Sequence, residues 1–346
     1  MASLEALPVE LLDSVCSLLS PCDLRSLVHV CSRVSPVAQR RLYRTIFTAP
    51  AAKNLSVVLT LARNPVLAQY VTSFSINLDS RPSLFLSFFR HLAVALGNMT
   101  NLVHLCVFVP PRLSWVLLPI KSYPSLSHFS SSFPFNSHVA TFLKATPSLL
   151  KLEVDTLSPS FQHDYLEPLP PSSVPLLSHF TGSDHAARAI VPGRPVQSLH
   201  ITTGHVDDSL VDAITQSTAD LAVFEAATTS FPASVLHLLS QYLHQMMYLR
   251  ISSTCTFSGL PDTVPFVSSS RAFFVLILLS KAFYQDVSNA LSKFPALEGF
   301  ELDGMLWGSV KTDHGRIWQS KPLDIDFGPE EGVEPLDSYS DFSYYY

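Results

Sequence analysis

Residues with nucleophilic or acid–base side chains occur throughout this chain of 346 residues, but their spacing matches no common catalytic motif. The sequence lacks a Gly-x-Ser-x-Gly elbow, a His-Glu-x-x-His helix and a Gly-x-x-x-x-Gly-Lys-Ser/Thr loop. Gly182-Ser183-Asp184-His185 holds the residue types of a hydrolase, but triad members come from separate elements, so we predict a turn here. His237 and His244 are seven residues apart on a predicted helix, where a surface or capping role is expected. The sequence therefore predicts no enzyme activity.

The cysteine pattern argues against a metal site. The five cysteines form no Cys-x-x-Cys pair and their number is odd, which supports neither a zinc site nor a disulfide framework. We therefore expect no metal, no cofactor and a reducing compartment, either cytoplasmic or nuclear. The cysteines are Cys16, Cys22, Cys31, Cys106 and Cys255.

Charge and hydropathy exclude two further classes of partner. The net charge is −6, whereas a nucleic-acid-binding protein normally presents a basic patch. The trio Arg40-Arg41-x-x-Arg44 is interpreted as the last turn of a helix. The strongest apolar run, Ala272 to Leu279, is far shorter than the roughly twenty residues that cross a bilayer. We expect a soluble protein without a signal peptide and without nucleic-acid or membrane partners.

The first part of the chain predicts three short helices. Pro8, Pro21 and Pro36 each suit a first helical position, where the missing N–H has no partner to lose. Ser20 and Ser35 are the predicted N-caps of the second and third helices. The apolar residues recur at helical spacing, and three helices of about a dozen residues can bury only part of such wide stripes. The remaining apolar surface is expected to bind a partner.

This stretch resembles an F-box. The resemblance is carried by Leu7-Pro8-x-Glu10-Leu11-Leu12, Asp23-Leu24, Leu27, Val30-Cys31-Ser32-Arg33, Leu42-Tyr43 and Ile46. It implies docking onto a Skp-family adaptor and thereby onto the core of a cullin ubiquitin ligase. The adaptor-binding residues that it implies are Leu7, Pro8, Leu11, Leu12, Leu24, Leu27 and Cys31. The alternative is an ordinary helical subdomain packed on the rest of the chain.

A pattern of three apolar residues, spaced as in Leu149-x-x-Leu152-x-Val154, recurs after residue 48. We call these three positions the apolar slots. The copies start 19 to 31 residues apart, which is similar to leucine-rich repeats, whose unit runs about 20–29 residues. Amphipathic helical segments lie between the copies, so strand and helix are expected to alternate. The family's Asn or Cys after each strand is absent, so the resemblance is to a degenerate array; the alternative is an irregular α/β domain. The copies begin at Val71, Leu102, Leu126, Leu149, Leu177, Val196, Leu221, Met246, Phe273 and Leu297.

Residues between the apolar slots are expected to form two polar rows on the open face of the sheet, because successive strand side chains face opposite sides. One row contains His104, His128, Lys151 and His179, which lie on successive predicted strands. We hypothesise that this face binds an acidic segment of a client protein, more strongly near pH 6 as histidines gain protons. A merely solvated face is the alternative. The predicted client-binding residues are His104, His128, Lys151, His179, Glu153, Glu225 and Arg250.

The predicted organisation is an F-box at residues 1–48, a leucine-rich-repeat-like region at 49–320 and an acidic, disordered tail at 321–346. Leu157 to Pro175 and Ser252 to Ser270 are predicted surface loops, because both are rich in Pro and Ser. The tail could alternatively be a peptide ligand for a basic or aromatic groove.

The predicted fold class is α/β, with a three-helix F-box followed by an irregular leucine-rich-repeat-like β/α solenoid. The resemblance implies a substrate-recruiting adaptor of an SCF-type ubiquitin ligase, with an unknown client. The alternative function is a leucine-rich-repeat-like scaffold whose N-terminal helices only cap the solenoid.

Overall fold

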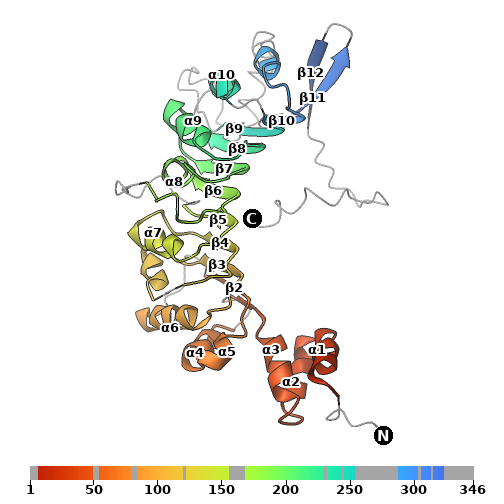
Figure 1. Cartoon of the computed structure of the whole chain (residues 1–346), viewed down its shortest axis with the longest axis vertical. Coiled ribbons are helices and arrows are strands. Elements are labelled where there is room, and N and C mark those ends of the chain that lie inside the picture. Colours follow the sequence, from red (N-terminus) through yellow and green to blue (C-terminus); the bar gives the residue numbers. More distant parts are fainter. Residues whose placement is uncertain are drawn as a thin grey trace, which may run out of the picture.

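The computed structural model describes residues 7–49, 54–78, 84–119, 122–155, 168–228, 232–242, 245–253, 287–302, 305–312 and 315–322. Within them the chain is mixed α/β. Three helices form a unit at the N-terminal end, and a long open sheet with helices along one side follows (Figure 1). This agrees with the predicted α/β class.

The described strands form one sheet of twelve in which every strand neighbours its successor in the chain. Strands β1 to β10 pair in parallel, and β10, β11 and β12 pair antiparallel. The strands are β1 (Thr45–Thr48), β2 (Ser73–Asn77), β3 (His104–Phe108), β4 (His128–Ser131), β5 (Lys151–Glu153), β6 (His179–Ser183), β7 (Ser198–Thr203), β8 (Val223–Thr228), β9 (Tyr248–Ser253), β10 (Gly299–Leu302), β11 (Met305–Thr312) and β12 (Gly315–Pro322).

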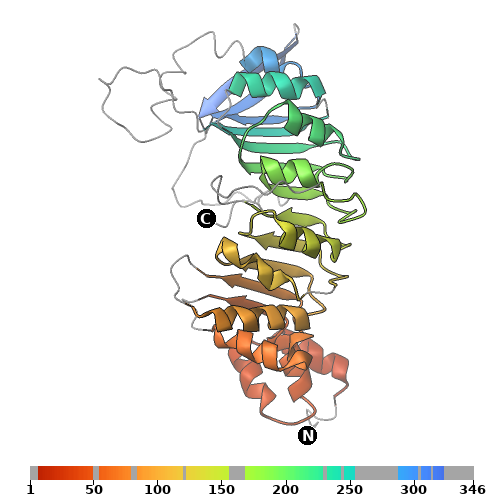
Figure 2. The ribbon, with the colours of Figure 1, turned by 90° about the vertical axis from the view of Figure 1, so that its left-hand side faces the viewer.

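Helices cover one face of this sheet, and in Figure 2 they lie in front of the strands. Parallel neighbours need a crossover, and a helix supplies it for most steps along the array. The helices are α1 (Val9–Ser17), α2 (Pro21–Val28), α3 (Ser35–Leu42), α4 (Ser56–Arg63), α5 (Pro65–Ala68), α6 (Leu86–Asn98), the 3-10 helix η3 (Pro111–Leu117), α7 (Ser137–Lys144), α8 (Asp184–Ile190), α9 (Asp208–Thr215) and α10 (Pro232–Tyr242), with a further helical turn at 287–291.

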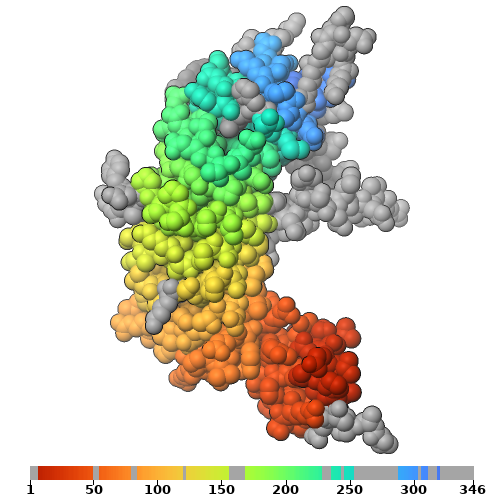
Figure 3. Space-filling view, viewed as in Figure 1, coloured from red at the N-terminus to blue at the C-terminus, as the bar shows by residue number. Residues whose placement is uncertain are grey.

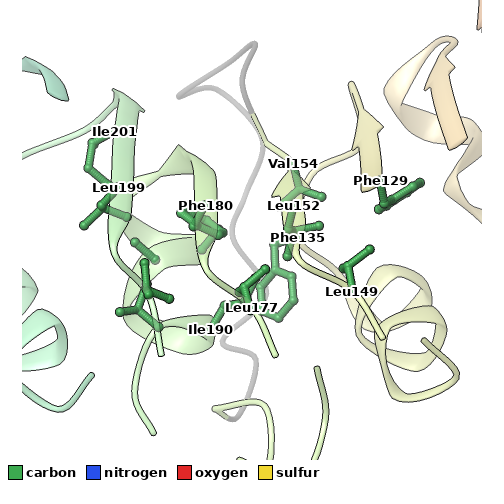
Figure 4. Packing of buried hydrophobic residues seen from close by; sticks show 14 of the residues in the cluster. Phe129, Phe135, Leu149, Leu152, Val154, Leu177, Phe180, Ile190, Leu199 and Ile201 are labelled. Atoms are coloured by element: carbon green, nitrogen blue, oxygen red, sulfur yellow. The ribbon is translucent and has the colours of Figure 1, made fainter. Parts of the chain in front are cut away.

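The three-slot pattern explains why these strands stack. Its middle slot forms a buried ladder across the sheet, in which Phe129 pairs with Leu152 and Leu152 with Phe180. These side chains follow one another beneath the sheet in Figure 4. Because a shift by one residue would turn every apolar side chain to the open face, this pattern sets the register.

Capping side chains start several of the covering helices. Asn136 accepts hydrogen bonds from the backbone N–H groups of His138 and Val139, and Asp207 accepts one from Leu210. Ser183 caps α8 by accepting from the N–H of Ala186. The prediction of a turn at Gly182-Ser183-Asp184-His185 is therefore wrong, because this run ends β6 and begins α8 directly.

The two ends of the sheet differ from the prediction. The sheet already begins at β1, so Ile46, expected in the F-box, packs in the core of the sheet. At the other end β11 and β12 form an antiparallel hairpin that the repeat pattern does not predict, and its Trp307 and Trp318 are buried against the sheet core. Strand β9 pairs directly with β10, while Phe273, which begins one predicted copy, lies outside the described residues.

The N-terminal helices have a hydrophobic core of their own. We call α1, α2 and α3 the helical module. Its core consists of Leu12, Cys16, Leu24, Val34, Val37 and Ala38, and the structure separates it from the core of the sheet. Figure 3 shows the module, in red, projecting from one end of the array.

Local contacts in the module follow the sequence with one exception. The Ser20 side chain caps α2, as predicted, by accepting from the N–H of Asp23, and its hydroxyl donates to the Asp23 carboxylate at 2.6 Å. Ser35 does not cap α3: the helix starts at Ser35 itself, with Val34 in the cap position and buried in the core. Val34, a buried core residue, therefore takes the cap position that was predicted for Ser35.

Residues 168–175, the described part of the predicted surface loop Leu157 to Pro175, contain no helix or strand, and most of them are exposed. Leu169, Ser173 and Val174 are buried, and the fully buried Arg194 donates to the carbonyl oxygens of Leu169 and Ser173, both at 3.0 Å. The prediction of a surface position is wrong for these three buried residues, which anchor the loop to the core. Residues 156–167, most of Ser252 to Ser270 and the predicted tail beyond Pro322 lie outside the described residues.

Within the described ranges, no helix is both long enough and apolar enough to cross a bilayer.

Candidate functional site

The helical module leaves an apolar stripe of α1 exposed. Leu11, Val15 and Leu18 recur at helical spacing and are 51%, 41% and 87% exposed. The neighbouring stripe of the same helix, Leu12 and Cys16, faces the module core. A helix of nine residues in so small a unit can bury only one side, so the second stripe stays in solvent. We call Leu11, Val15 and Leu18 the α1 stripe.

The structure divides the predicted adaptor-binding residues into three groups. Pro8 and Leu11 are exposed. Leu7, Leu27 and Cys31 are half-buried and pack against the module core.

Leu12 and Leu24 are buried inside that core, so the prediction that they contact an adaptor requires correction: a direct contact would require the module to open. Val15, Leu18 and Val30, which were not among the predicted residues, are exposed instead. The 3.6-residue period places Leu11, Val15 and Leu18 on one face, and this signal could have identified the stripe.

Polar groups of the module stabilise it without forming a reactive centre. Arg40 of α3 pairs with Asp13 of α1 at 3.1 Å, and both side chains are exposed, so the pair adds less than about 1 kcal/mol. Burial, followed by the Asp13 charge, raises the pKa of the Cys16 thiol. A neutral thiol in the core serves packing rather than nucleophilic chemistry.

The open face of the sheet carries both polar rows in the expected register. His104 pairs with His128, His128 with Lys151, and Lys151 with His179 on the successive strands β3 to β6. The rings of His104 and His128 stack with centroids 4.5 Å apart and an interplanar angle of 25°. We call His104, His128, Lys151 and His179 the histidine–lysine row.

Two identical sequence segments flank Lys151. Leu126-Ser127-His128-Phe129 enters β4 and Leu177-Ser178-His179-Phe180 enters β6. In each the serine Oγ contacts the next residue's imidazole Nδ1, at 2.7 Å for His128 and 2.8 Å for His179. The serines thus hold both rings in matching orientations on either side of the β5 lysine.

The pKa of His128 contradicts the hypothesis that binding strengthens near pH 6 through this residue. Burial, followed by the neighbouring His104, Lys151 and His179, lowers its pKa to about 4. Burial, followed by Lys151, also lowers the pKa of His179. Both imidazoles are therefore harder to protonate than a free histidine, because the row is partly desolvated and already holds positive charge.

Towards the C-terminal strands the second polar row forms a ladder of opposite charges. Glu225 lies 3.9 Å from His200 and 4.0 Å from Arg250, and the Arg250 Nε lies 3.3 Å from the Glu301 Oε1. The Tyr248 hydroxyl donates to Glu301 at 3.3 Å. We call His200, Glu225, Arg250 and Glu301 the charge ladder.

Three predicted client-binding residues already have partners within the sheet. Glu225 and Arg250 belong to the charge ladder, and Glu153 accepts a hydrogen bond of 2.5 Å from the Ser130 hydroxyl. A client would have to compete with these contacts.

The described residues contain no group of three or more His, Cys, Asp or Glu side chains that could hold a metal ion. Burial, followed by the Glu153 charge, raises the pKa of the Cys106 thiol on the open face, and this environment does not favour a thiolate.

Comparison of the chain with models of known protein families and with curated protein sequences gave no match. The structure by itself defines a mixed α/β chain with two surfaces of distinct chemistry: an apolar stripe on a separately cored helical module and a polar face on an open sheet.

Proposed function

We propose that this chain is a substrate-recruiting adaptor of an SCF-type ubiquitin ligase. In this proposal the helical module is an F-box that docks onto a Skp-family adaptor through the α1 stripe and its half-buried neighbours. The sheet and its helices are a degenerate leucine-rich-repeat-like solenoid whose open face binds a client protein. The chain performs no chemistry and acts by raising the effective concentration of the client beside the ligase.

The separate core of the helical module is the observation that carries the proposal. If the helices only capped the solenoid, their apolar residues would pack into the core of the sheet. They pack against one another instead, and the α1 stripe faces away from that packing. This arrangement favours a docking module over the alternative of a scaffold with a helical cap.

The α1 stripe can supply a substantial part of a docking energy. Complete burial of a Val or Leu side chain is worth about 1.5–3 kcal/mol. Scaled by the exposed fractions of Leu11, Val15 and Leu18, covering the stripe contributes roughly 4 kcal/mol. Leu7, Leu27 and Cys31 lie half-buried on the same module and can add to this interface.

Binding of the full chain to a purified Skp-family adaptor by isothermal titration calorimetry tests the proposal. The variant Leu11→Asp with Val15→Lys places an acidic residue in the first turn and a basic one near the end of α1, where the helix dipole tolerates each charge. We expect at least a hundredfold weaker binding with an unchanged circular dichroism spectrum.

The matched control is Leu86→Asp with Val94→Lys. These residues of α6 are 52% and 49% exposed, close to the exposure of Leu11 and Val15, but they belong to the sheet domain. The control should bind as tightly as the unchanged chain. No binding by the unchanged chain, or equal loss in both variants, would refute the docking role.

A further inference from the structure

Two glycines lie side by side on the open face of the sheet, on the strands β10 and β11 at the end of the array opposite to the helical module (Figure 1). Phe300 of β10 pairs with Trp307 of β11, and both side chains are buried in the core. The two strands are antiparallel, so the residues next to this pair, Gly299 and Gly308, are also neighbours and face the opposite side. We call Gly299 and Gly308 the glycine floor.

Neither the backbone conformation nor the packing requires a glycine at position 308. Its φ is not in the left-handed region, and an added Cβ would have no atom within 4 Å. Gly299 differs, because the ring of Tyr248 lies over it: an added Cβ there would be 3.3 Å from the Tyr248 Cδ2. A glycine inside a strand often marks a close approach of a ligand or of another chain. The space above Gly308 is open to such a ligand.

Apolar side chains border this open space. Leu306 and Val310 are each two residues from Gly308 on β11, so both point to the same face as the floor, and both are exposed. On the other side of the floor stands the ring of Tyr248. A flat aromatic ring laid on Gly308 would cover the two apolar side chains and remove them from water.

A half-buried carboxylate lies on the same face, on β8. The two basic neighbours of the Glu225 carboxylate, His200 and Arg250, are 3.9 and 4.0 Å away, which is beyond hydrogen-bond distance. Burial lowers the pKa of His200, so this imidazole is neutral at pH 7. Arg250 lies closer to Glu301, at 3.3 Å. Glu225 therefore keeps acceptor capacity for a cation, because a partly buried carboxylate is stabilised by charged hydrogen bonds.

The distance between these two features defines the spacing of a ligand. Glu225 on β8 and Gly308 on β11 are three strands apart in the order of the sheet and are offset by two residues along the strands. At about 4.8 Å per strand and about 3.3 Å per residue, the separation is roughly 16 Å. Four residues of an extended peptide cover about 13 Å and return to the same face. The length of a Lys or Arg side chain covers the remainder.

We propose that this end of the open face binds an extended peptide segment in which an aromatic residue and a Lys or Arg stand four residues apart. The aromatic ring covers Gly308 between Leu306 and Val310, and the cation binds Glu225. Only the role of this segment as part of a client rests on the proposed function; the binding itself does not need a ligase. The site lies apart from the histidine–lysine row and selects a basic segment rather than an acidic one.

Selection of random 12-residue peptides displayed on phage, with the full chain as bait, tests this proposal. Among retained peptides we expect at least fivefold enrichment of Phe, Tyr or Trp paired with Lys or Arg four residues away. Gly308→Ile fills the space above the floor without removing a contact, and a β-branched residue suits a strand, so the variant should fold normally. It should lose the aromatic preference, whereas Glu225→Gln should lose only the basic one.

Fluorescence anisotropy with the most enriched peptide, labelled and synthesised, measures the size of the effect. Gly308→Ile should bind this peptide at least about tenfold more weakly, as expected when one aromatic side chain can no longer be buried. The matched control Ser73→Ile places the same side chain on the open face at β2, and it should bind like the unchanged chain.

Four outcomes would overturn the proposal: no retained peptide, retained peptides without the aromatic–basic pair, enrichment of acidic peptides, or equal binding by Gly308→Ile and Ser73→Ile. Adaptor binding through the α1 stripe is measured separately by calorimetry, so the peptide site and the docking role can each fail alone.

Discussion

Replacing Arg194 by methionine tests how the interior of the sheet domain is held together. The Arg194 side chain is fully buried and pairs with no described carboxylate; instead its guanidinium donates to five backbone carbonyl groups. They belong to Leu169 at 3.0 Å, Pro170 at 2.8 Å, Ser173 at 3.0 Å, Pro192 at 3.1 Å and Ile190. This residue therefore ties the segment before β6 to the end of α8.

The size of the effect follows from two opposing contributions. Burial lowers the pKa of Arg194 to about 10, so the folded state keeps the guanidinium charged at pH 7 at a cost of roughly 3 kcal/mol. The hydrogen bonds to Leu169, Ser173 and Ile190 are buried, and each charged bond is worth about 1.5–3 kcal/mol. Methionine removes both contributions and leaves buried carbonyls unpaired, so we expect a net loss of about 4 kcal/mol.

Chemical denaturation followed by circular dichroism measures this loss. Arg90→Met, on the exposed side of α6, is the matched control and should change the unfolding free energy by less than about 0.5 kcal/mol. Arg194→Lys should also destabilise, because three ammonium donors cannot reach five carbonyls. Equal stability of Arg194→Met and Arg90→Met would refute the reasoning.

Three further predictions concern two single contacts and the helical module. Gly182→Ala should lower the unfolding free energy by about 1–3 kcal/mol in the same denaturation assay, because the added Cβ would lie 2.3 Å from the Val154 carbonyl oxygen. The control Gly308→Ala should be nearly neutral, because no atom lies within 4 Å of its added Cβ. Tyr123→Phe should cost about 1–2 kcal/mol, because the buried hydroxyl donates to the Leu96 carbonyl at 2.5 Å; a thermal shift below one degree would argue against this bond. Deletion of residues 1–42 should leave a monomer by size-exclusion chromatography, since the module core is separate, whereas aggregation would support the cap alternative.

The sequence predicts the middle of the sheet well. The apolar slots around Leu105, Leu152 and Leu199 repeat with the period of a strand and are too apolar to face solvent, so both the strands and their register follow from them. The alternating positions then place His104, His128 and Lys151 side by side without further information.

The ends of the array were not predictable in this way. Thr45–Thr48 lies in the stretch that resembles an F-box, yet it forms a strand that pairs with β2. The β11–β12 hairpin has no repeat counterpart, and its burial depends on the tryptophans Trp307 and Trp318 meeting the end of the core.

The candidate site was predictable in part. In α1, Leu11 and Leu12 belong to adjacent stripes of similar hydropathy, and only packing against α2 and α3 decides which stripe is inside. The lowered pKa of His128 arises from burial and from neighbours on other strands, and the role of Arg194 arises from carbonyl groups distant in the sequence. Neither leaves a local pattern that sequence reasoning could detect.

Hydrogen–deuterium exchange of the full chain, with and without a saturating Skp-family adaptor, tests the docking claim most directly. We expect slower exchange in α1 and α2, residues 9–28, and no change in the strands β3 to β9. Unchanged exchange in α1, or protection confined to the open face of the sheet, would contradict the proposed role of the helical module.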